Sequence, residues 1–258
     1  MEVRQRWRFY LSEIVGTAVL LAVGLSIVIF MFGDGSPAAQ WIPNIRIRQS
    51  LTGFLFGATG GLISMSYVGR ESGAHLNPAV TFAFWIVRKI ETRVAVGYAV
   101  SQLVGAVIGS LPLLAWGAMG RSISFGATSP GAEYTVGEAL VGEVVTTLIL
   151  VLTLCVFIGY RRLRPFTPAA MPVLYAIMVP LEASISGIST NPARTFGPAI
   201  VSGCWDSWWI YWVGPLAGTL VAMIAVSFLG KRIEVAKLYH FDSDRDRFFR
   251  RMATGEAT

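Results

Sequence analysis

Two copies of the tripeptide Asn-Pro-Ala have the residue types and spacing that point most directly to a chemical role. They are Asn77, Pro78 and Ala79, and Asn191, Pro192 and Ala193. Asn is a favourable N-cap, and Pro at the first helical position loses no hydrogen bond that it needs, so each copy predicts a helix start. If the two helix starts meet, both side-chain amides can donate hydrogen bonds to one passing oxygen. The positive ends of both helix dipoles would then repel cations and protons.

Charged side chains within apolar sequence form a second group of candidates. They are Glu13, Glu143, Glu182 and Arg194. An arginine at membrane depth usually has a function, and a structural salt bridge is the alternative for Arg194. The sequence presents no nucleophile with a base, and it has only two histidines and two cysteines. We therefore expect no enzyme, no metal site and no cofactor.

The composition indicates a membrane protein. Of the 258 residues, 54% are hydrophobic and 14% are charged, whereas a soluble domain has about 25% charged residues. The net charge is +6, but the basic residues flank apolar segments and do not gather into one patch. This pattern favours a lipid bilayer over nucleic acid as the partner.

Six apolar stretches are long enough to cross a bilayer, which requires about 20 residues. Their predicted bounds are 9–32, 50–68, 94–117, 137–159, 168–186 and 208–229. Two further stretches, 77–88 and 191–202, are too short to cross alone, and they begin with the two tripeptides. The sequence thus predicts an all-α membrane protein with two half-helices that enter the membrane from opposite sides.

The second half of the chain repeats the first. Residues 12–17, Ser-Glu-Ile-Val-Gly-Thr, match residues 142–147, Gly-Glu-Val-Val-Thr-Thr, and Asn77 and Asn191 follow at corresponding places. Three spans and one half-helix in each copy require the two copies to be inverted in the membrane. Of the 21 Lys and Arg residues, 17 lie before the first span, between the second and third, after the fourth or after the sixth. The positive-inside rule therefore predicts cytoplasmic termini in a multi-pass protein of the cell membrane, plasma or inner.

These features together resemble the aquaporin family, also called the major intrinsic protein family. They are the paired tripeptides, the arginine three residues after the second Asn, Gly-Ala-His-Leu at 73–76 and a glutamate early in spans one and four. The resemblance implies a right-handed bundle of six tilted helices plus two half-helices, arranged as an inverted 3+3 repeat, and a homotetramer with one pore in each subunit. The channel domain would cover 9–229, with repeats at about 9–117 and 137–229. A cytoplasmic N-terminus, 1–8, and a cytoplasmic tail, 230–258, would flank it.

The resemblance also implies a passive channel for water and small neutral solutes that excludes protons and ions. Irregular backbone at membrane depth must satisfy its polar groups or line water, so the segments before the half-helices could present a file of carbonyl acceptors. The residues concerned are Gly73, Ala74, His75, Gly187, Ile188, Ser189 and Thr190. We expect the His75 ring to pack against neighbouring helices. A secondary transporter, which also uses inverted repeats and broken helices, is the alternative of another class.

The family's pore constriction has four positions, and the resemblance places Arg194 at one of them. Counting back from the two Asn residues places the others at Gly57, Val179 and Ile188. Strict water channels resemble each other in having a bulky aromatic residue and a histidine where this chain has Gly57 and Val179. We therefore expect a wide, apolar constriction, as in channels mainly for glycerol-like or metalloid solutes. Thr195, where glycerol channels usually have Asp, favours the water-channel class instead.

The three carboxylates each have two interpretations. Glu13 and Glu143 could line the pore, but their matching places in the two repeats favour buried acceptors for the backbone amides of the irregular loops. Glu182 lies three residues after Val179, so the two residues share a helix face. We hypothesise that Glu182 lies in the outer vestibule near Arg194 and tunes its donors. The alternative is that Glu182 caps a loop amide.

Overall fold

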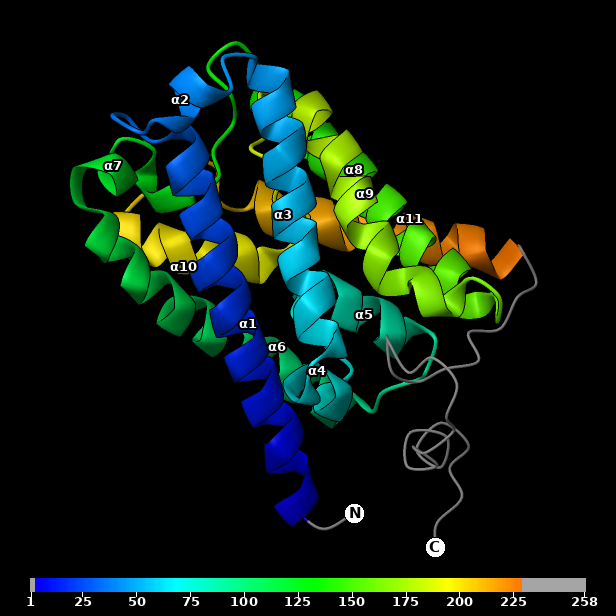
Figure 1. Cartoon of the computed structure of the whole chain (residues 1–258). Coiled ribbons are helices and arrows are strands. Elements are labelled where there is room, and N and C mark those ends of the chain that lie inside the picture. Colours follow the sequence, from blue (N-terminus) through cyan, green and yellow to red (C-terminus); the bar gives the residue numbers. More distant parts are fainter. Residues whose placement is uncertain (1–2, 229–258) are drawn as a thin grey trace, which may run out of the picture.

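The structure, a computed structural model, describes residues 3–228, and every regular element in that part of the chain is helical (Figure 1). The predicted all-α fold is confirmed for these residues. Helices occupy all six predicted spans. They are α1 Val3–Phe32, α3 Ile45–Met65, α6 Thr92–Ser110, α8 Val136–Gly159, α9 Thr167–Glu182 and α11 Ile210–Phe228. The predicted tail, 230–258, lies outside the described residues.

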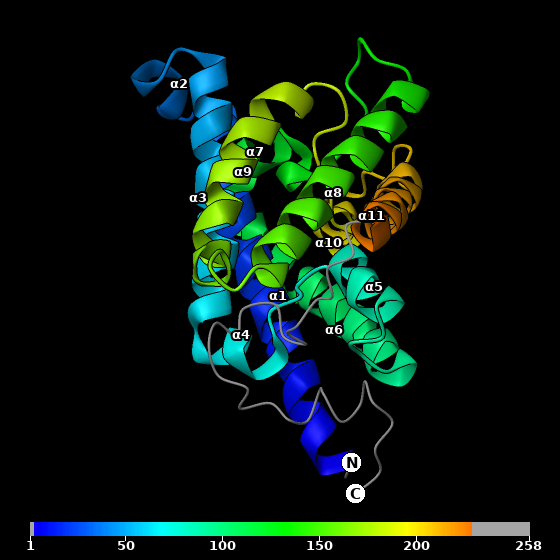
Figure 2. The same ribbon diagram turned by 90° about the vertical axis from the view of Figure 1, so that its right-hand side faces the viewer.

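Two short helices, α5 (Pro78–Ile86) and α10 (Pro192–Ser202), begin at the two tripeptides. Asn77 Oδ1 accepts a hydrogen bond from the backbone N–H of Ala79 at 2.8 Å, and Asn191 Oδ1 accepts one from Ala193 at 3.0 Å. Both Asn residues are therefore N-caps, each followed by Pro at the first helical position. Figures 1 and 2 place α5 and α10 between the long helices. Helices α2 (Ala38–Trp41) and α7 (Gly117–Arg121) lie toward one end of the bundle and α4 (Tyr67–Ser72) toward the other.

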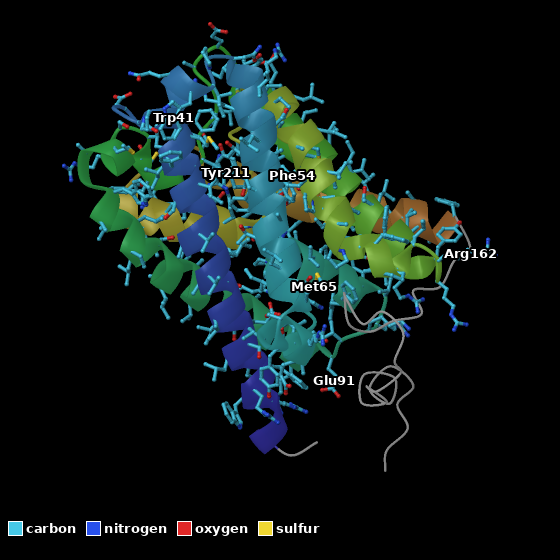
Figure 3. All side chains as sticks on the ribbon, in the orientation of Figure 1. Trp41, Phe54, Met65, Glu91, Arg162 and Tyr211 are labelled. Atoms are coloured by element: carbon cyan, nitrogen blue, oxygen red, sulfur yellow. The ribbon has the colours of Figure 1, made fainter. Side chains whose placement is uncertain are left out.

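Four helical stretches in the described part of the chain are long and apolar enough to cross a membrane. They are Arg6–Phe32, Thr92–Arg121, Val136–Gly159 and Ile210–Phe228. Helix α9 has only 16 residues, and α3 carries Arg46 and Arg48 in its first turn, so the count of six spans stays a prediction. Apolar side chains cover the outer surface: Phe54 and Met65 on α3 are 44% and 49% exposed, whereas Tyr211 is buried inside the bundle (Figure 3). An apolar exterior of this kind is suited to contact with lipid.

Glycines form the closest helix contacts. Gly53, Gly57 and Gly61 recur every four residues on α3 and face α9, so that a Cβ atom on Gly53 would lie 2.2 Å from the carbonyl oxygen of Tyr175. Small residues allow helix backbones to approach closely, which stabilises helix pairs within lipid. Gly105 and Gly109 join α6 to α1, and Gly214 and Gly218 join α11 to α8 in the same way. These two helix pairs occupy corresponding places in the two predicted repeats.

One helix end differs from the prediction in a way that matters for the site. The span predicted at 50–68 ends at Met65, and the chain turns at Ser66 before α4 begins. Ser66 has extended backbone, and its Oγ accepts a hydrogen bond from the backbone N–H of Gly69 at 3.3 Å. Ser66 therefore caps a new helix, and the helical register of α3 does not continue through it. The short 3-10 segments Leu111–Trp116, Ser124–Gly126 and Arg164–Phe166 were not predicted either.

Candidate functional site

The two Asn side chains connect α5 with α10. Nδ2 of Asn77 donates a hydrogen bond to the carbonyl oxygen of Thr190 at 2.9 Å, and Nδ2 of Asn191 donates one to the carbonyl oxygen of Leu76 at 2.9 Å. Each half-helix is thus tied to the loop that precedes the other. An amide nitrogen carries two hydrogens, so each Asn retains one further donor, and both side chains line the same cavity.

A buried carboxylate holds each of these two loops. Glu13 accepts hydrogen bonds at 3.1 and 2.8 Å from the backbone N–H groups of the two residues before Asn77. Glu143 accepts them at 2.6 and 2.8 Å from the two residues before Asn191. Each carboxylate also accepts from a serine hydroxyl five residues before its Asn, at 2.6 and 2.7 Å. Since both side chains are 0% exposed, these hydrogen bonds offset the cost of removing the carboxylates from water.

Both loops adopt backbone conformations that residues other than glycine rarely adopt. The φ angle is +50° at Ala74 and +52° at Leu76 in the first loop, and +46° at Ile188 and +53° at Thr190 in the second. Each such residue costs about 1–3 kcal/mol and persists only where its surroundings hold it. The carboxylate contacts provide that support at the same places in both loops.

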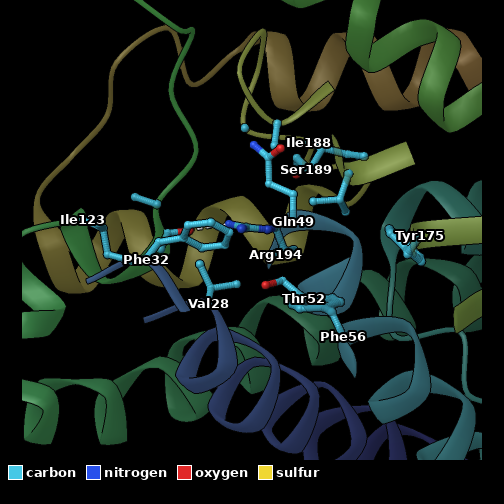
Figure 4. Close-up of a pocket in the computed structure, with 15 residues that line it drawn as sticks. Val28, Phe32, Gln49, Thr52, Phe56, Ile123, Tyr175, Ile188, Ser189 and Arg194 are labelled. Atoms are coloured by element: carbon cyan, nitrogen blue, oxygen red, sulfur yellow. Dashed lines mark hydrogen bonds between the residues drawn. The ribbon is translucent and has the colours of Figure 1, made fainter. Parts of the chain in front are cut away.

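Two cavities adjoin the loop that precedes α10. The large cavity, of about 250 Å³, lies among α1, α3, α9 and the loop before α10, and Figure 4 shows Arg194 among its side chains. The small cavity, of about 80 Å³, contains both Asn side chains in its lining. Four residues line both cavities: Phe56, Tyr175, Ser189 and Arg194. These four residues, which we call the junction, mark where the two cavities meet.

Most of the residues predicted to present pore carbonyls lie at a cavity wall. Ala74 and His75 line the small cavity, and Gly187, Ile188 and Ser189 line the large one. Gly73, which ends α4 with a φ angle of +90°, and Thr190 line neither. The Thr190 carbonyl accepts the Asn77 amide instead.

Arg194 lies in the first turn of α10 and is only 8% exposed. Its Nη1 donates a hydrogen bond to the carbonyl oxygen of Gly126. The guanidinium is therefore held by a backbone oxygen, and within residues 3–228 it forms no ion pair with a carboxylate. Val179 and Ile188 line the same large cavity as Arg194, so three of the four predicted constriction residues come together.

The fourth, Gly57, lines the small cavity and not the large one, so its place in the constriction stays a prediction. A Cβ atom on Gly57 would lie 2.8 Å from the carbonyl oxygen of Met171 on α9, so this position points at a helix backbone and only borders the small cavity. Phe56 lies at the junction instead. Counting back from Asn77 crosses the turn at Ser66, where the helical register is lost. The aromatic ring of Phe56 therefore lies at the junction, directly beside the predicted position Gly57.

Glu182 lines neither the large cavity nor the small one. The side chain is 6% exposed and packs over Gly142 of α8, where a Cβ atom would lie 1.9 Å from Oε1. Val179 on α9 and Ala183, the residue that directly follows α9, line the large cavity, whereas Glu182 is absent from its lining. Within the described residues Oε1 has no hydrogen-bond partner. The hypothesis that Glu182 tunes Arg194 in the vestibule is therefore not supported by the geometry.

Several supporting residues were missed by the sequence analysis. The hydroxyl of Tyr98 donates to the carbonyl of Ser72 at 2.8 Å, and that of Tyr211 donates to the carbonyl of Ser186 at 2.7 Å. The pair occupies corresponding places in the two repeats, which is the signal that could have identified it. The His75 ring packs against Tyr98, with ring centroids 5.1 Å apart.

Comparisons with known proteins agree with this architecture. The family model for the major intrinsic proteins matches residues 1–226. The chain is 33% identical over 227 residues to Aquaporin-8 of Rattus norvegicus, a match that covers 84% of this chain and 80% of the relative. It is 32% identical over 239 residues to Aquaporin AqpM of Methanothermobacter marburgensis, covering 85% and 96%. The fold matches the aquaglyceroporin structure from Plasmodium falciparum with a TM-score of 0.69 at 22% identity, covering 85% of this chain and 94% of that one.

The paired half-helices, the carboxylate-supported loops and the adjoining cavities define a helical membrane channel. The chain belongs to the major intrinsic protein family. Members of this family are passive channels and not enzymes. The comparisons give no support to the alternative of a secondary transporter.

Proposed function

We propose that this protein conducts water and small neutral solutes passively and excludes protons and ions. The observation that carries the proposal is that Asn77 and Asn191, at the starts of α5 and α10, each donate a side-chain hydrogen bond to the loop that precedes the other half-helix. Each helix start carries about half a positive charge, and this field repels cations. The remaining amide hydrogens donate to a solute oxygen. A water held in this way donates outward, which interrupts a chain of proton transfer.

Arg194 acts in this proposal as a second barrier to cations and as a donor to the solute. Its buried guanidinium lines both cavities, so every solute that passes the junction comes near a positive charge. The backbone carbonyls of Ala74, His75, Gly187 and Ser189, residues that line the two cavities, accept hydrogen bonds from the solute in this proposal. Together these donors and acceptors replace the hydrogen bonds that a solute loses on leaving bulk water.

Water is the favoured solute, because two aromatic rings, Phe56 and Tyr175, lie at the junction. A second candidate is a channel mainly for glycerol-like or metalloid solutes. It is favoured by Val179 and Ile188, whose apolar side chains line the large cavity. We place the protein in the cell membrane, plasma or inner, with both termini cytoplasmic, in line with its basic residues. We further propose a homotetramer, which rests on the family resemblance alone.

Stopped-flow light scattering on proteoliposomes tests the proposal. After a hypertonic step with an impermeant sugar, the shrinkage rate of the vesicles reports water flux. Steps with glycerol and with boric acid report the entry of those solutes, and protein-free vesicles give the background. We expect water flux far above the protein-free background and slower entry of glycerol and boric acid. Entry of either solute as fast as water would favour the second candidate, and water flux at background would refute the channel proposal.

A further inference from the structure

Tyr175 lies where the two cavities meet, at a position that the four-residue constriction does not include. It is one turn before Val179 on α9, and it lines both cavities, whereas Val179 lines the large cavity. A solute that moves from the space beside Ile188 to the space beside Asn191 must therefore pass the Tyr175 ring.

Three contacts, two from α3 and one from the loop before α10, hold Tyr175 in place. The Phe56 ring on α3 lies with its centroid 6.2 Å away, tilted by 49°. The backbone of Tyr175 is pressed against Gly53 of α3, where a Cβ atom would lie 2.2 Å from the Tyr175 carbonyl oxygen. The phenol oxygen lies 2.9 Å from Oγ1 of Thr190. Because backbone, ring and hydroxyl are each in contact with a neighbour, rotation of the ring out of the path is restricted.

The hydroxyl contact has a direction. The Thr190 hydroxyl donates to the carbonyl oxygen of Ser189 at 2.7 Å. A hydroxyl has one hydrogen to donate, so Tyr175 donates to Thr190, and Thr190 donates to Ser189. Thr190 also receives the Asn77 amide at its carbonyl oxygen. The hydroxyl of Tyr175 thus fastens the ring to the same loop that orients the Asn pair.

We propose that Tyr175 sets the upper size limit for solutes, with its ring as a steric barrier that Thr190 holds in place. The inference rests on the proposed channel function and names the residue that separates water from larger neutral solutes. A rigid ring discriminates by size because a solute wider than the gap must displace side chains that are already anchored.

The test measures the ratio of glycerol to water permeability in proteoliposomes for wild type, Tyr175→Val, Tyr175→Phe and Thr190→Val. Phe54→Ala is the matched control, since it removes an aromatic ring from the exposed surface of α3. We expect Tyr175→Val to raise the ratio about tenfold, because loss of the ring lowers the barrier to the passage of glycerol. Tyr175→Phe and Thr190→Val, which break the same hydrogen bond, should each raise the ratio about twofold, and their combination should raise it no further.

The outcomes separate the two proposals. If wild type conducts no water above protein-free vesicles, the channel function fails and this inference falls with it. If wild type conducts water but Tyr175→Val keeps the ratio of wild type and of Phe54→Ala, the inference alone is overturned. If Tyr175→Val does not fold, the other two variants decide: raised ratios support the inference, and unchanged ratios overturn it.

Discussion

Glu13 and Glu143 are the residues on which the geometry of the site most depends. Each accepts two backbone N–H groups and one serine hydroxyl from a loop that would otherwise leave its donors unpaired inside the bundle. Hydrogen bonds to a charged acceptor contribute about 1.5–3 kcal/mol each. These contacts maintain loop conformations in which several residues other than glycine have φ angles near +50°.

Replacing Glu143 with Gln should weaken the second loop. The amide has one oxygen and one NH2 group, so at least one loop N–H would face another donor. We expect a lower unfolding temperature in detergent and lower water permeability. The matched control is Glu133→Gln, at an exposed site. An unfolding temperature for Glu143→Gln equal to that of the control would contradict the role assigned to this carboxylate.

Replacing Glu182 with Gln should have a different result. Its Oε1 is buried without a partner, and the side chain does not line either cavity. A buried unpaired oxygen is destabilising, so the neutral amide should leave the protein equally or more stable. Water permeability and solute preference should match wild type in proteoliposomes. A changed ratio of glycerol to water permeability would show that Glu182 acts on the conduction path.

Helices α3 and α9 determine the width of the pore region, because the glycine row on α3 sets how closely they approach. At Gly57 a Cβ atom would lie 2.8 Å from backbone atoms of α9, whereas at Gly60 the nearest atom would be a Leu20 side-chain carbon at 3.9 Å. The two positions are only three residues apart on one helix. They therefore offer a matched comparison of a packed and an open site.

We expect Gly57→Ala to destabilise the protein by about 1–3 kcal/mol, the usual effect of an added methyl group in a packed contact. Gly60→Ala should be neutral or slightly stabilising, because Ala loses less chain entropy in a helix than Gly. Thermal unfolding monitored by size-exclusion recovery in detergent would measure both. Equal stability of the two variants would show that α3 and α9 are not in contact at residue 57.

Much of this arrangement could be predicted from the sequence, because its causes are local. Asn followed by Pro specifies a helix start, and the predicted starts at residues 78 and 192 coincide with α5 and α10. Apolar runs likewise located the long helices. The places of Phe56 and Glu182 could not be derived, because each depends on tertiary structure. Phe56 depends on the turn at Ser66, and Glu182 depends on which neighbour α9 packs against.

At the scale of the whole molecule, the prediction concerns orientation in the membrane. The connection between α1 and α2 and the connection between α8 and α9 should lie on opposite sides, with the second in the cytoplasm. Asp34 and Arg162 are exposed in these two connections. In a background without Cys155 and Cys204, both of which are free thiols, a cysteine at 34 should react with an impermeant maleimide in intact cells. A cysteine at 162 should react only after the cells are opened, and the reverse pattern would contradict the orientation.

The measurement that tests the central claim most directly is water flux and proton flux in the same proteoliposomes. Water permeability would be taken from light scattering, and proton entry from an entrapped pH-sensitive dye under a potassium diffusion potential. If Asn77, Asn191 and Arg194 act as proposed, water permeability should exceed that of protein-free vesicles by more than about tenfold, while proton entry stays at their level. Proton entry that rises in proportion to water flux, or water flux no faster than in protein-free vesicles, would contradict the account.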